Sequence, residues 1–415
     1  MANNEAIVLI IGDIQPIEGA DRIVSAGVFL KGTKLTQVII GKGRFKEGDL
    51  AVYFDSNLCL SDAVIKLDPK LTTYLSKGNR VKCITLKNTV SNGLVLPVEM
   101  FRPLVFMPSL LVEGFSFTEL GVIKICWKYV APVRQPTVST KTKGRRKVVT
   151  SRVIPEMFKF HTDTQQLLRN AHVIKPDTVI SISRKIHGTS FVVAHTAVVR
   201  KLSFIDRIAQ KLGVHVVNTE YDYLYSSRNV VKNDKMDGGF YDTDVWTHVG
   251  KKHFEDKLHQ GETVYGEAYG YLPSGGMIQK PFDYGCAEGE TKIAVYRITL
   301  TSADGTVSEY DWMAMKERCA ELGVPMVEEF YYGEARSLFN FPEDENWNYS
   351  FIKALKDLYL EQDCPYCVNK CPDEGVVIKI SGLYINAFKL KSERFLLKES
   401  KLKEDEAFDD VEDSI

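Results

Sequence analysis

Short apolar or alternating stretches, each ended by a turn signal, follow one another through the first 130 residues. The breaks between them include KGTK, GKGRFKEGD and SNG, which are rich in residues that favour turns. Many short strands without a long helical period predict a small β-barrel, and the OB-like barrel is the best match. The expected strands are Ile7–Ile11, Val28–Leu30, Gln37–Ile40, Ala51–Phe54, Val81–Leu86 and Gly93–Pro97.

A change of composition follows this region. The stretch APVRQPTVSTKTKGRRKVVTSR, residues 131–152, contains two prolines, few apolar residues and a dense basic run. The run is either a solvated linker or an arm that contacts the phosphates of a nucleic acid. Its basic residues are Lys141, Lys143, Arg145, Arg146 and Lys147.

From Val153 onward the pattern is mixed. The segment TDTQQLLRNA opens with a possible capping box, Thr162 and Gln165, and predicts a short helix. The other expected elements are strands at 179–183, 190–199, Val376–Ile380 and Ala387–Leu390, and helices near Trp312–Leu322 and Tyr349–Gln362. The chain is therefore predicted to be α+β.

We predict four segments. An OB-like nucleic-acid-binding domain occupies 1–130, a basic linker 131–152, a second domain 153–403, and an acidic, frayed tail 404–415.

Composition limits the possible partners. The net charge of the 415 residues is −1, so a polyanion must be held by a local patch and not by global attraction. The longest early apolar run, Ala6–Ile11, is too short to span a bilayer. We expect an intracellular protein without a membrane partner, in the cytoplasm or, as the alternative, the nucleus.

The cysteines suggest a reducing compartment. Five of the eight are scattered singly, as buried thiols usually are. The other three stand together in CPYCVNKC as Cys364, Cys367 and Cys371. They make a partial zinc signature without a local fourth ligand, so a loop with ordinary thiols is favoured over zinc.

A lysine stands at a break between two strands in SISRKIHGTSFVV. A free lysine is protonated at neutral pH and is a poor nucleophile, but nearby cations or burial can activate Lys185. Gly188, three residues on, allows a ligand to approach the backbone. The motif KxHG alone is weak and is also compatible with a surface lysine at a turn.

Further motifs lie downstream of Lys185, and two of them have a geometry that can be predicted. In NAFKLKS, Lys389 and Lys391 lie on one face of an expected strand, where two ammonium groups favour an anion between them. In VYGEAYG, Glu267 is flanked on its face by two tyrosines. The remaining motifs are YSSRN with Arg228, KIAVYRITL with Tyr296 and DEGVVIKI with Glu374.

Taken together, these blocks resemble motifs I, Ia, III, IIIa, IV and V of the covalent nucleotidyltransferases, the superfamily of polynucleotide ligases and capping enzymes. KIHGTSF, with histidine where KxDG has aspartate, is similar to nick-joining RNA ligases. The N-terminal motifs GADRI and FKEGDLAVYFDS, with FHTDTQQL at 160–167, resemble the Deinococcus/Naegleria type, which places an OB domain before the catalytic domain.

The resemblance implies an ATP-dependent RNA ligase that seals 3′-OH and 5′-phosphate ends at nicks in duplex nucleic acid, acting as a monomer. Lysyl-AMP forms first, AMP then passes to the RNA 5′-phosphate, and the 3′-hydroxyl finally displaces it. Lys185 would be the nucleophile, and Lys389 and Lys391 would neutralise the α-phosphate. Arg228 would lie near the AMP ribose and the incoming phosphate, Glu267 would accept a ribose hydroxyl or order metal-bound water, and Gly188 would lie beside the nucleotide.

A divalent metal is implied as well. Glu374, and Glu267 through water, would hold Mg²⁺ or Mn²⁺. Tyr296 is a candidate to stack on adenine, with plain core packing as the alternative. His187 would bind phosphate or the Glu374 carboxylate, or stabilise the turn.

Two other functions compete with this one. A GTP-dependent capping guanylyltransferase would carry a further OB domain, whereas the residues after Lys391 are few and acidic. A non-catalytic OB-type RNA-binding protein would have no need of Lys185, Glu267, Glu374 and the paired lysines.

Overall fold

Alternating apolar residues give the N-terminal part a sheet with a core on each face. The computed structural model describes residues 4–130, 152–232, 244–382 and 386–404. The first sheet is antiparallel, in the order β3-β2-β1-β4-β8, with β9 also paired to β1. Within β1, Ala6 and Val8 enter one core while Ile7, Leu9 and Ile11 enter the other. The strands are β1 (Ala6–Pro16), β2 (Ile23–Leu30), β3 (Thr33–Gly41), β4 (Leu50–Phe54), β8 (Leu94–Pro97) and β9 (Ser116–Phe117).

Smaller elements complete this part. They are the strand pairs β5 (Leu58–Leu60) with β12 (Cys126–Lys128), β6 (Cys83–Leu86) with β7 (Thr89–Asn92), and β10 (Glu119–Leu120) with β11 (Ile123–Lys124). The helices are α1 (Asp62–Leu67) and the 3₁₀ helices η1 (Pro69–Thr73), η2 (Lys77–Asn79), η3 (Val98–Met100), η4 (Arg102–Leu104) and η5 (Pro108–Leu110). The short strands expected here are confirmed.

The second part contains two sheets. One has the order β13-β23-β22-β14-β21, antiparallel except for the parallel pair of β13 and β23. Its strands are β13 (Gln165–Gln166), β14 (Val179–Arg184), β21 (Glu329–Glu334), β22 (Gly375–Ile380) and β23 (Ala387–Lys391). The other is antiparallel, in the order β17-β16-β15-β18-β19-β20. Its strands are β15 (Thr189–Val199), β16 (Thr219–Ser226), β17 (Val231–Lys232), β18 (Glu262–Gly270), β19 (Thr291–Thr301) and β20 (Val307–Glu309).

Helices flank these sheets. The expected helix near Trp312–Leu322 is confirmed as α4 (Trp312–Leu322), capped by Asp311 and ended by Gly323 in the left-handed conformation. The expected helix near Tyr349–Gln362 is confirmed as α6 (Trp347–Tyr359). The others are α2 (Phe204–Lys211), α3 (Val245–His253), α5 (Ala335–Leu338) and α7 (Glu393–Glu404).

The helix expected to begin at Thr162 is wrong. Gln165 and Gln166 form β13 instead and pair with Phe388 and Lys389 of β23, and a 3₁₀ helix, η6 (Leu167–Val173), follows. Pairing with a distant strand outweighs the local capping signal at this place. The basic run 141–147 lies outside the described residues, as do the linker positions 131–151 and the tail from 405 onward.

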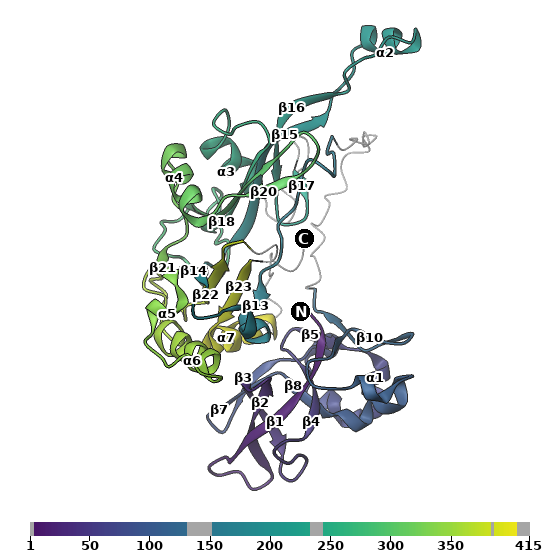
Figure 1. Ribbon diagram of the computed structural model, residues 1–415, viewed down its shortest axis with the longest axis vertical. Helices are drawn as coiled ribbons and strands as arrows, with labels where there is room; N and C mark the ends of the chain where they lie inside the picture. Colours follow the sequence, from purple (N-terminus) through teal and green to yellow (C-terminus); the bar gives the residue numbers. More distant parts are fainter. Residues whose placement is uncertain (1–3, 131–151, 233–243, 383–385, 405–415) are drawn as a thin grey trace.

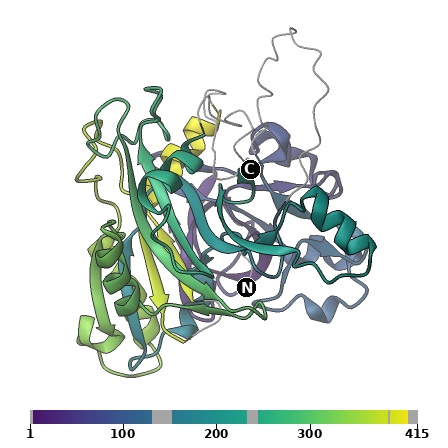
Figure 2. The ribbon, with the colours of Figure 1, turned by 90° about the horizontal axis from the view of Figure 1, so that it is seen from above.

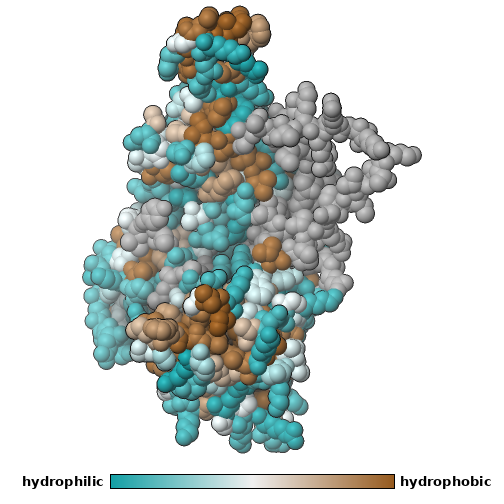
Figure 3. Space-filling model, turned by 90° about the vertical axis from the view of Figure 1, so that its right-hand side faces the viewer, coloured by the Kyte–Doolittle hydropathy of each residue, from teal (hydrophilic) through white to brown (hydrophobic). Residues whose placement is uncertain are grey.

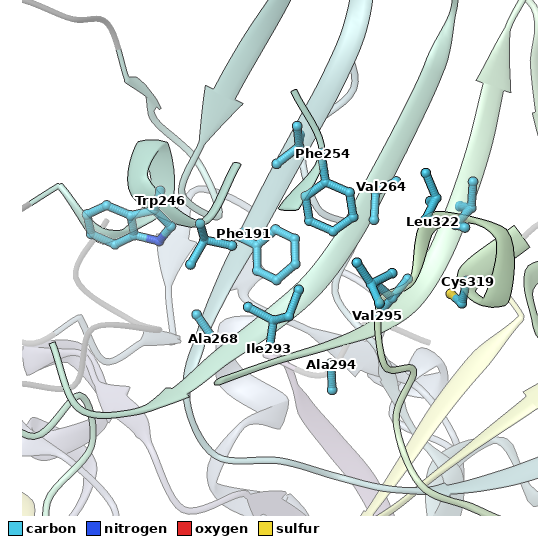
Figure 4. Close-up of a cluster of buried hydrophobic side chains, with 14 of the residues drawn as sticks. Phe191, Trp246, Phe254, Val264, Ala268, Ile293, Ala294, Val295, Cys319 and Leu322 are labelled. Atoms are coloured by element: carbon cyan, nitrogen blue, oxygen red, sulfur yellow. The ribbon is translucent and has the colours of Figure 1, made fainter. Parts of the chain in front are cut away.

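The largest core lies between the six-stranded sheet and its helices. Phe191, Phe254 and Trp246 are buried there against branched residues of β18 and β19 (Figure 4). This core fixes β15 and β18, the two strands that carry Ser190 and Glu267.

The two parts stack along the long axis of the molecule. The N-terminal sheet lies at the lower end of Figure 1 and beneath the other sheets in Figure 2. At the opposite end, α2 projects from the β15–β16 hairpin with no buried residue, and Phe204, Ile205 and Leu212 are exposed. This helix forms the brown cap at the top of Figure 3.

Candidate active site

The loop that holds Lys185 crosses from one sheet to the other. β14 ends at Arg184 in the five-stranded sheet and β15 begins at Thr189 in the six-stranded sheet. Ile180 and Ile182 anchor β14 in the core, and the Lys185 amide donates to the Gly375 carbonyl at 2.9 Å. The break between two strands in the sequence is therefore the boundary between two sheets.

Glu374 lies directly before β22 and joins two of the predicted lysines. Its Oε1 atom is 3.0 Å from Lys185 Nζ and 2.8 Å from Lys391 Nζ. The carboxylate side chain is fully buried. Gly375 follows with φ of 129°, and a Cβ there would meet the Leu390 carbonyl at 2.1 Å, so only glycine fits. The close approach of β23 that this glycine permits brings Lys391 to Glu374.

His187 is held between aromatic rings. Its amide donates to the Tyr284 hydroxyl at 2.7 Å, and its ring contacts Phe282 and Phe395 edge-on at 4.9 and 5.0 Å. Nδ1 lies 3.8 Å from Glu374 Oε2, which is too long for a hydrogen bond. The ring thus faces the carboxylate but does not bind it directly.

Glu267 of β18 fixes the end of the lysine loop. It accepts the Gly188 amide at 3.1 Å on one oxygen and the Ser190 hydroxyl at 3.1 Å on the other. A Cβ on Gly188 would lie 2.3 Å from the Ala268 carbonyl. The buried carboxylate therefore holds the loop from the side of the six-stranded sheet.

A cleft of about 560 Å³ lies between the N-terminal part and the second part. Lys389, Lys391 and Arg228 line one wall, and Lys128 and Asn57 line the other. Arg228 also forms an ion pair with Asp163. The two lysines predicted to share a strand face do line the same cleft.

Tyr296 has different neighbours. On β19 its hydroxyl shares a hydrogen bond of 2.8 Å with His161 Nδ1, and the two rings meet edge-on. The side chain is partly buried and packs against core residues, among them Val192 and Tyr265. These contacts describe a packed tyrosine, and the stacking role remains a prediction.

A buried ion pair that the sequence analysis did not predict lies next to Lys185 and Glu374 in the chain. Arg184, the residue before Lys185, contacts Asp373, the residue before Glu374, and lies 2.7 Å from Glu328. Burial raises the pKa of the Asp373 carboxyl although the Arg184 charge opposes it. The available signal was charge alone: a second basic residue precedes Lys185 and a second acidic residue precedes Glu374.

The three clustered cysteines are buried beside the site. The Cys364 amide donates to the Cys371 carbonyl at 2.7 Å, which closes the loop, and Cys371 Sγ lies 3.5 Å from Lys398 Nζ. A hydrogen bond with Cys367, and then the Lys398 charge, lower the pKa of Cys371 to about 7 although burial opposes this. Among the described residues, no three His, Cys, Asp or Glu side chains are grouped to hold a metal.

Comparison with known structures agrees with this architecture. A variant of Naegleria gruberi RNA ligase in the apo form is 19% identical with a TM-score of 0.61, over 97% of this chain and 100% of that chain. A variant of that ligase with ATP and Mn, and the ligase with PPi, are each 19% identical at a TM-score of 0.61, over 95% of this chain and 98% of theirs. No curated protein matches the chain.

Two family models match. Residues 6–98 match an OB-fold domain. The fold is therefore an OB fold followed by a mixed α+β domain, which confirms the predicted fold class. Residues 178–398, more than half of the chain, match the RNA ligase model. The chain belongs to the RNA ligase family, and the predicted resemblance is confirmed. No described helix is long and apolar enough to cross a membrane.

Proposed function

We propose that this RNA ligase uses ATP to seal 3′-OH and 5′-phosphate ends through a lysyl-AMP intermediate on Lys185. The observation that carries the proposal is the contact of Lys185 and Lys391 with one buried oxygen of Glu374, at 3.0 and 2.8 Å. A second cation beside a lysine favours its neutral, nucleophilic form and stabilises negative charge on a phosphate. The similar Naegleria structures with ATP, Mn and PPi support ATP as the substrate.

The reaction consists of three balanced transfers. The Lys185 amine, after losing a proton, forms a bond to the α-phosphorus of ATP and pyrophosphate leaves. The RNA 5′-phosphate then attacks the same phosphorus, and the lysine amine is released. Finally the 3′-hydroxyl attacks the activated 5′-phosphate, the phosphodiester forms, and AMP leaves with the electron pair of the broken bond.

The remaining residues of the site are assigned to the ribose, the phosphates and the adenine. Glu267 orients the loop through Gly188 and accepts a ribose hydroxyl. Lys389, Lys391 and Arg228 hold phosphate groups in the cleft, and Lys128 adds a cation from the opposite wall. His187 contributes to phosphate binding beside Glu374. We assign Tyr296 to the adenine side of the nucleotide.

A divalent cation fits the carboxylates of Glu374 and Glu267 only if it keeps part of its hydration shell. Glu374 and Glu267 are hard oxygen donors, but each also has protein partners, and no described trio of ligands surrounds a single point. Mg²⁺ characteristically keeps several waters and uses one or two carboxylates with substrate phosphates. When bound it would neutralise charge on the phosphates.

The substrate is proposed to be a nick in duplex nucleic acid with RNA at its 3′-OH side. The cleft has a cation on each wall, Lys128 from the N-terminal part and Arg228, Lys389 and Lys391 from the second part, among acidic residues such as Asp55 and Glu361. Cations on both walls suit a strand end that contacts the OB fold and the ligase domain together. A panel of RNA–RNA, RNA–DNA and DNA–DNA nicks tests this. Equal sealing of all three would contradict an RNA requirement.

Self-labelling tests the central proposal. Protein mixed with α-labelled ATP and a divalent cation should keep label after denaturation, and Lys185→Ala should abolish it because the attacking amine is gone. Lys175→Ala is the matched control, since that lysine is exposed just before β14. Labelling from GTP alone would indicate capping chemistry, and no label from either nucleotide would indicate a binding protein.

A further inference from the structure

Helix α7 connects the strand of the paired lysines to the N-terminal part. It starts at Glu393, two residues after Lys391, and the Ser392 amide donates to the Glu374 carbonyl at 3.0 Å. Lys398 of this helix contacts the cysteine loop, and three contacts of other α7 residues cross to the barrel. They are Thr36 Oγ1 to Glu393 Oε1 at 3.1 Å, the Cys83 amide to Ser400 Oγ at 3.1 Å, and Lys82 Nζ to Glu404 Oε1 at 2.9 Å.

Glu399 lies at the centre of this helix and is 6% exposed. Its Oε1 atom is 3.9 Å from Lys391 Nζ and 3.5 Å from Lys403 Nζ, and Oε2 accepts from the Asn57 side-chain amide at 3.3 Å. Burial alone would raise the pKa of Glu399, but the charges of Lys403 and Lys391 bring it below its ordinary value. The side chain is therefore a carboxylate in the folded protein.

One buried carboxylate thus contacts three functional groups of different origin. Lys391 comes from β23, Lys403 from α7 and Asn57 from the N-terminal part. Lys403 alone could balance the charge of Glu399, since it is 2% exposed and also donates to Asn57 Oδ1 at 3.3 Å. Glu399 nevertheless also approaches Lys391. The Lys391 ammonium therefore has two neighbouring carboxylates, Glu374 and Glu399.

We propose that Glu399 is a positioning residue that holds Lys391 for nucleotidyl transfer, and that docking of the OB fold through Asn57 sets its position. This inference rests on the proposed function of Lys185. Its consequence is that loss of the Glu399 carboxylate, or of its Asn57 contact, slows lysine adenylylation. Such an effect must appear in the rate at saturating ATP, because Lys391 is held for the transition state.

Three variants separate this role from simple charge balance. Glu399→Gln keeps the shape and the Asn57 contact but removes the charge, and it should slow self-adenylylation at saturating ATP about tenfold or more. The ATP concentration for half-maximal rate should change less than about threefold. Glu399→Gln with Lys403→Met also removes the unbalanced buried cation, and it should restore the melting temperature without restoring the rate.

The third variant tests the barrel connection. Asn57 has φ of 79°, which glycine adopts without strain, so Asn57→Gly keeps the backbone and removes the side-chain contacts to Glu399, Lys403 and Arg80. We expect a smaller loss in the same direction. The matched control is Lys82→Ala, which deletes an exposed α7–barrel ion pair far along the same helix and should label at the wild-type rate.

Each result decides between the alternatives. A double variant that labels at the wild-type rate would show that Glu399 only balances Lys403. A fully active Asn57→Gly would refute the coupling to the barrel. If the wild-type protein itself takes no label, the proposed function fails and this inference fails with it, whereas equal labelling of wild type and Glu399→Gln contradicts this inference alone.

Discussion

Two ammonium groups share one carboxylate oxygen at the centre of the site. Glu374 alone would favour the protonated form of Lys185, because an anion stabilises a neighbouring cation. Lys391 occupies the same oxygen, 2.8 Å away, and so weakens the hold of Glu374 on Lys185. The charge of the buried Glu374 carboxylate is therefore still balanced by Lys391 when Lys185, the proposed nucleophile, loses its proton.

Adding one methyl group at Gly188 should disturb the loop that carries Lys185. Gly188→Ala would place Cβ 2.3 Å from the Ala268 carbonyl and 3.0 Å from Glu267 Cγ, so the lysine loop must move away from β18. We expect about 2 kcal/mol lower stability in urea unfolding and a clear loss of self-labelling. Gly41→Ala, where a Cβ meets nothing within 4 Å, is the control and should unfold like the wild type.

Local motifs located the residues that we propose to react but not the residues that hold them. Lys185, Glu374 and Lys391 were found because each stands in a short pattern with a chemical meaning. Ser190 and Glu399 were missed because their importance comes from contacts with β18 and with the barrel. No pattern within a few residues of either position records such a contact.

At the scale of elements, an ion-pair network joins the two sheets of the ligase domain. Glu309 on β20 lies 2.7 Å from Lys379 on β22 and 2.8 Å from Arg297 on β19. Burial by itself would raise the pKa of Glu309, but the charges of Lys379 and Arg297 lower it. The pKa of Lys379 is lowered by burial, and the Glu309 charge only partly offsets this effect. The sheet boundary that carries Lys185 is thus tied at a second place.

Removing this link should destabilise the domain in a pH-dependent way. Glu309→Gln leaves Lys379 buried without its carboxylate, and we expect about 3 kcal/mol lower stability at pH 7 in urea unfolding. A carboxylate with a lowered folded-state pKa stabilises above its unfolded value of about 4.3 and loses this contribution as the pH falls. The wild type should therefore lose more stability than the variant between pH 7 and about pH 3.

The control for this experiment is Glu317→Gln on the exposed face of α4, which should change stability by less than about 0.5 kcal/mol. An equal dependence on pH in wild type and Glu309→Gln would contradict the assignment of the ion pairs.

Strands were easier to predict than two of the helical segments. β14, β22 and β23 follow from regular apolar alternation, which tertiary packing then reinforces. The segment after Thr162 was predicted as a helix because its capping signal is local, whereas the pairing with β23 is not. Helix α7 escaped prediction because its buried face includes Glu399 and Ser400, so the apolar period is weak.

The cleft belongs to the molecule as a whole, since neither part forms it alone. Its predicted role in binding nucleic acid can be tested through charge. Lys128→Ala should weaken binding to nicked duplex and reduce the slope of log affinity against log salt by about one, because one phosphate contact is lost. Self-labelling should be retained, as Lys128 is assigned to the nucleic acid and not to ATP.

Lys316→Ala is the comparison, because this exposed lysine lies on α4 and pairs with Glu329. Its salt slope should equal that of the wild type. An unchanged slope for Lys128→Ala would show that the barrel wall of the cleft does not contact phosphate.

A cleft with one wall from each part has a thermodynamic consequence. Any molecule that touches both walls binds only when the parts are correctly oriented, so part of its binding free energy is spent on fixing that orientation. By the same linkage, whatever loosens the junction raises the apparent dissociation constant without altering a single contact. Affinity for a molecule that touches both walls is therefore a property of the junction as much as of the lysines.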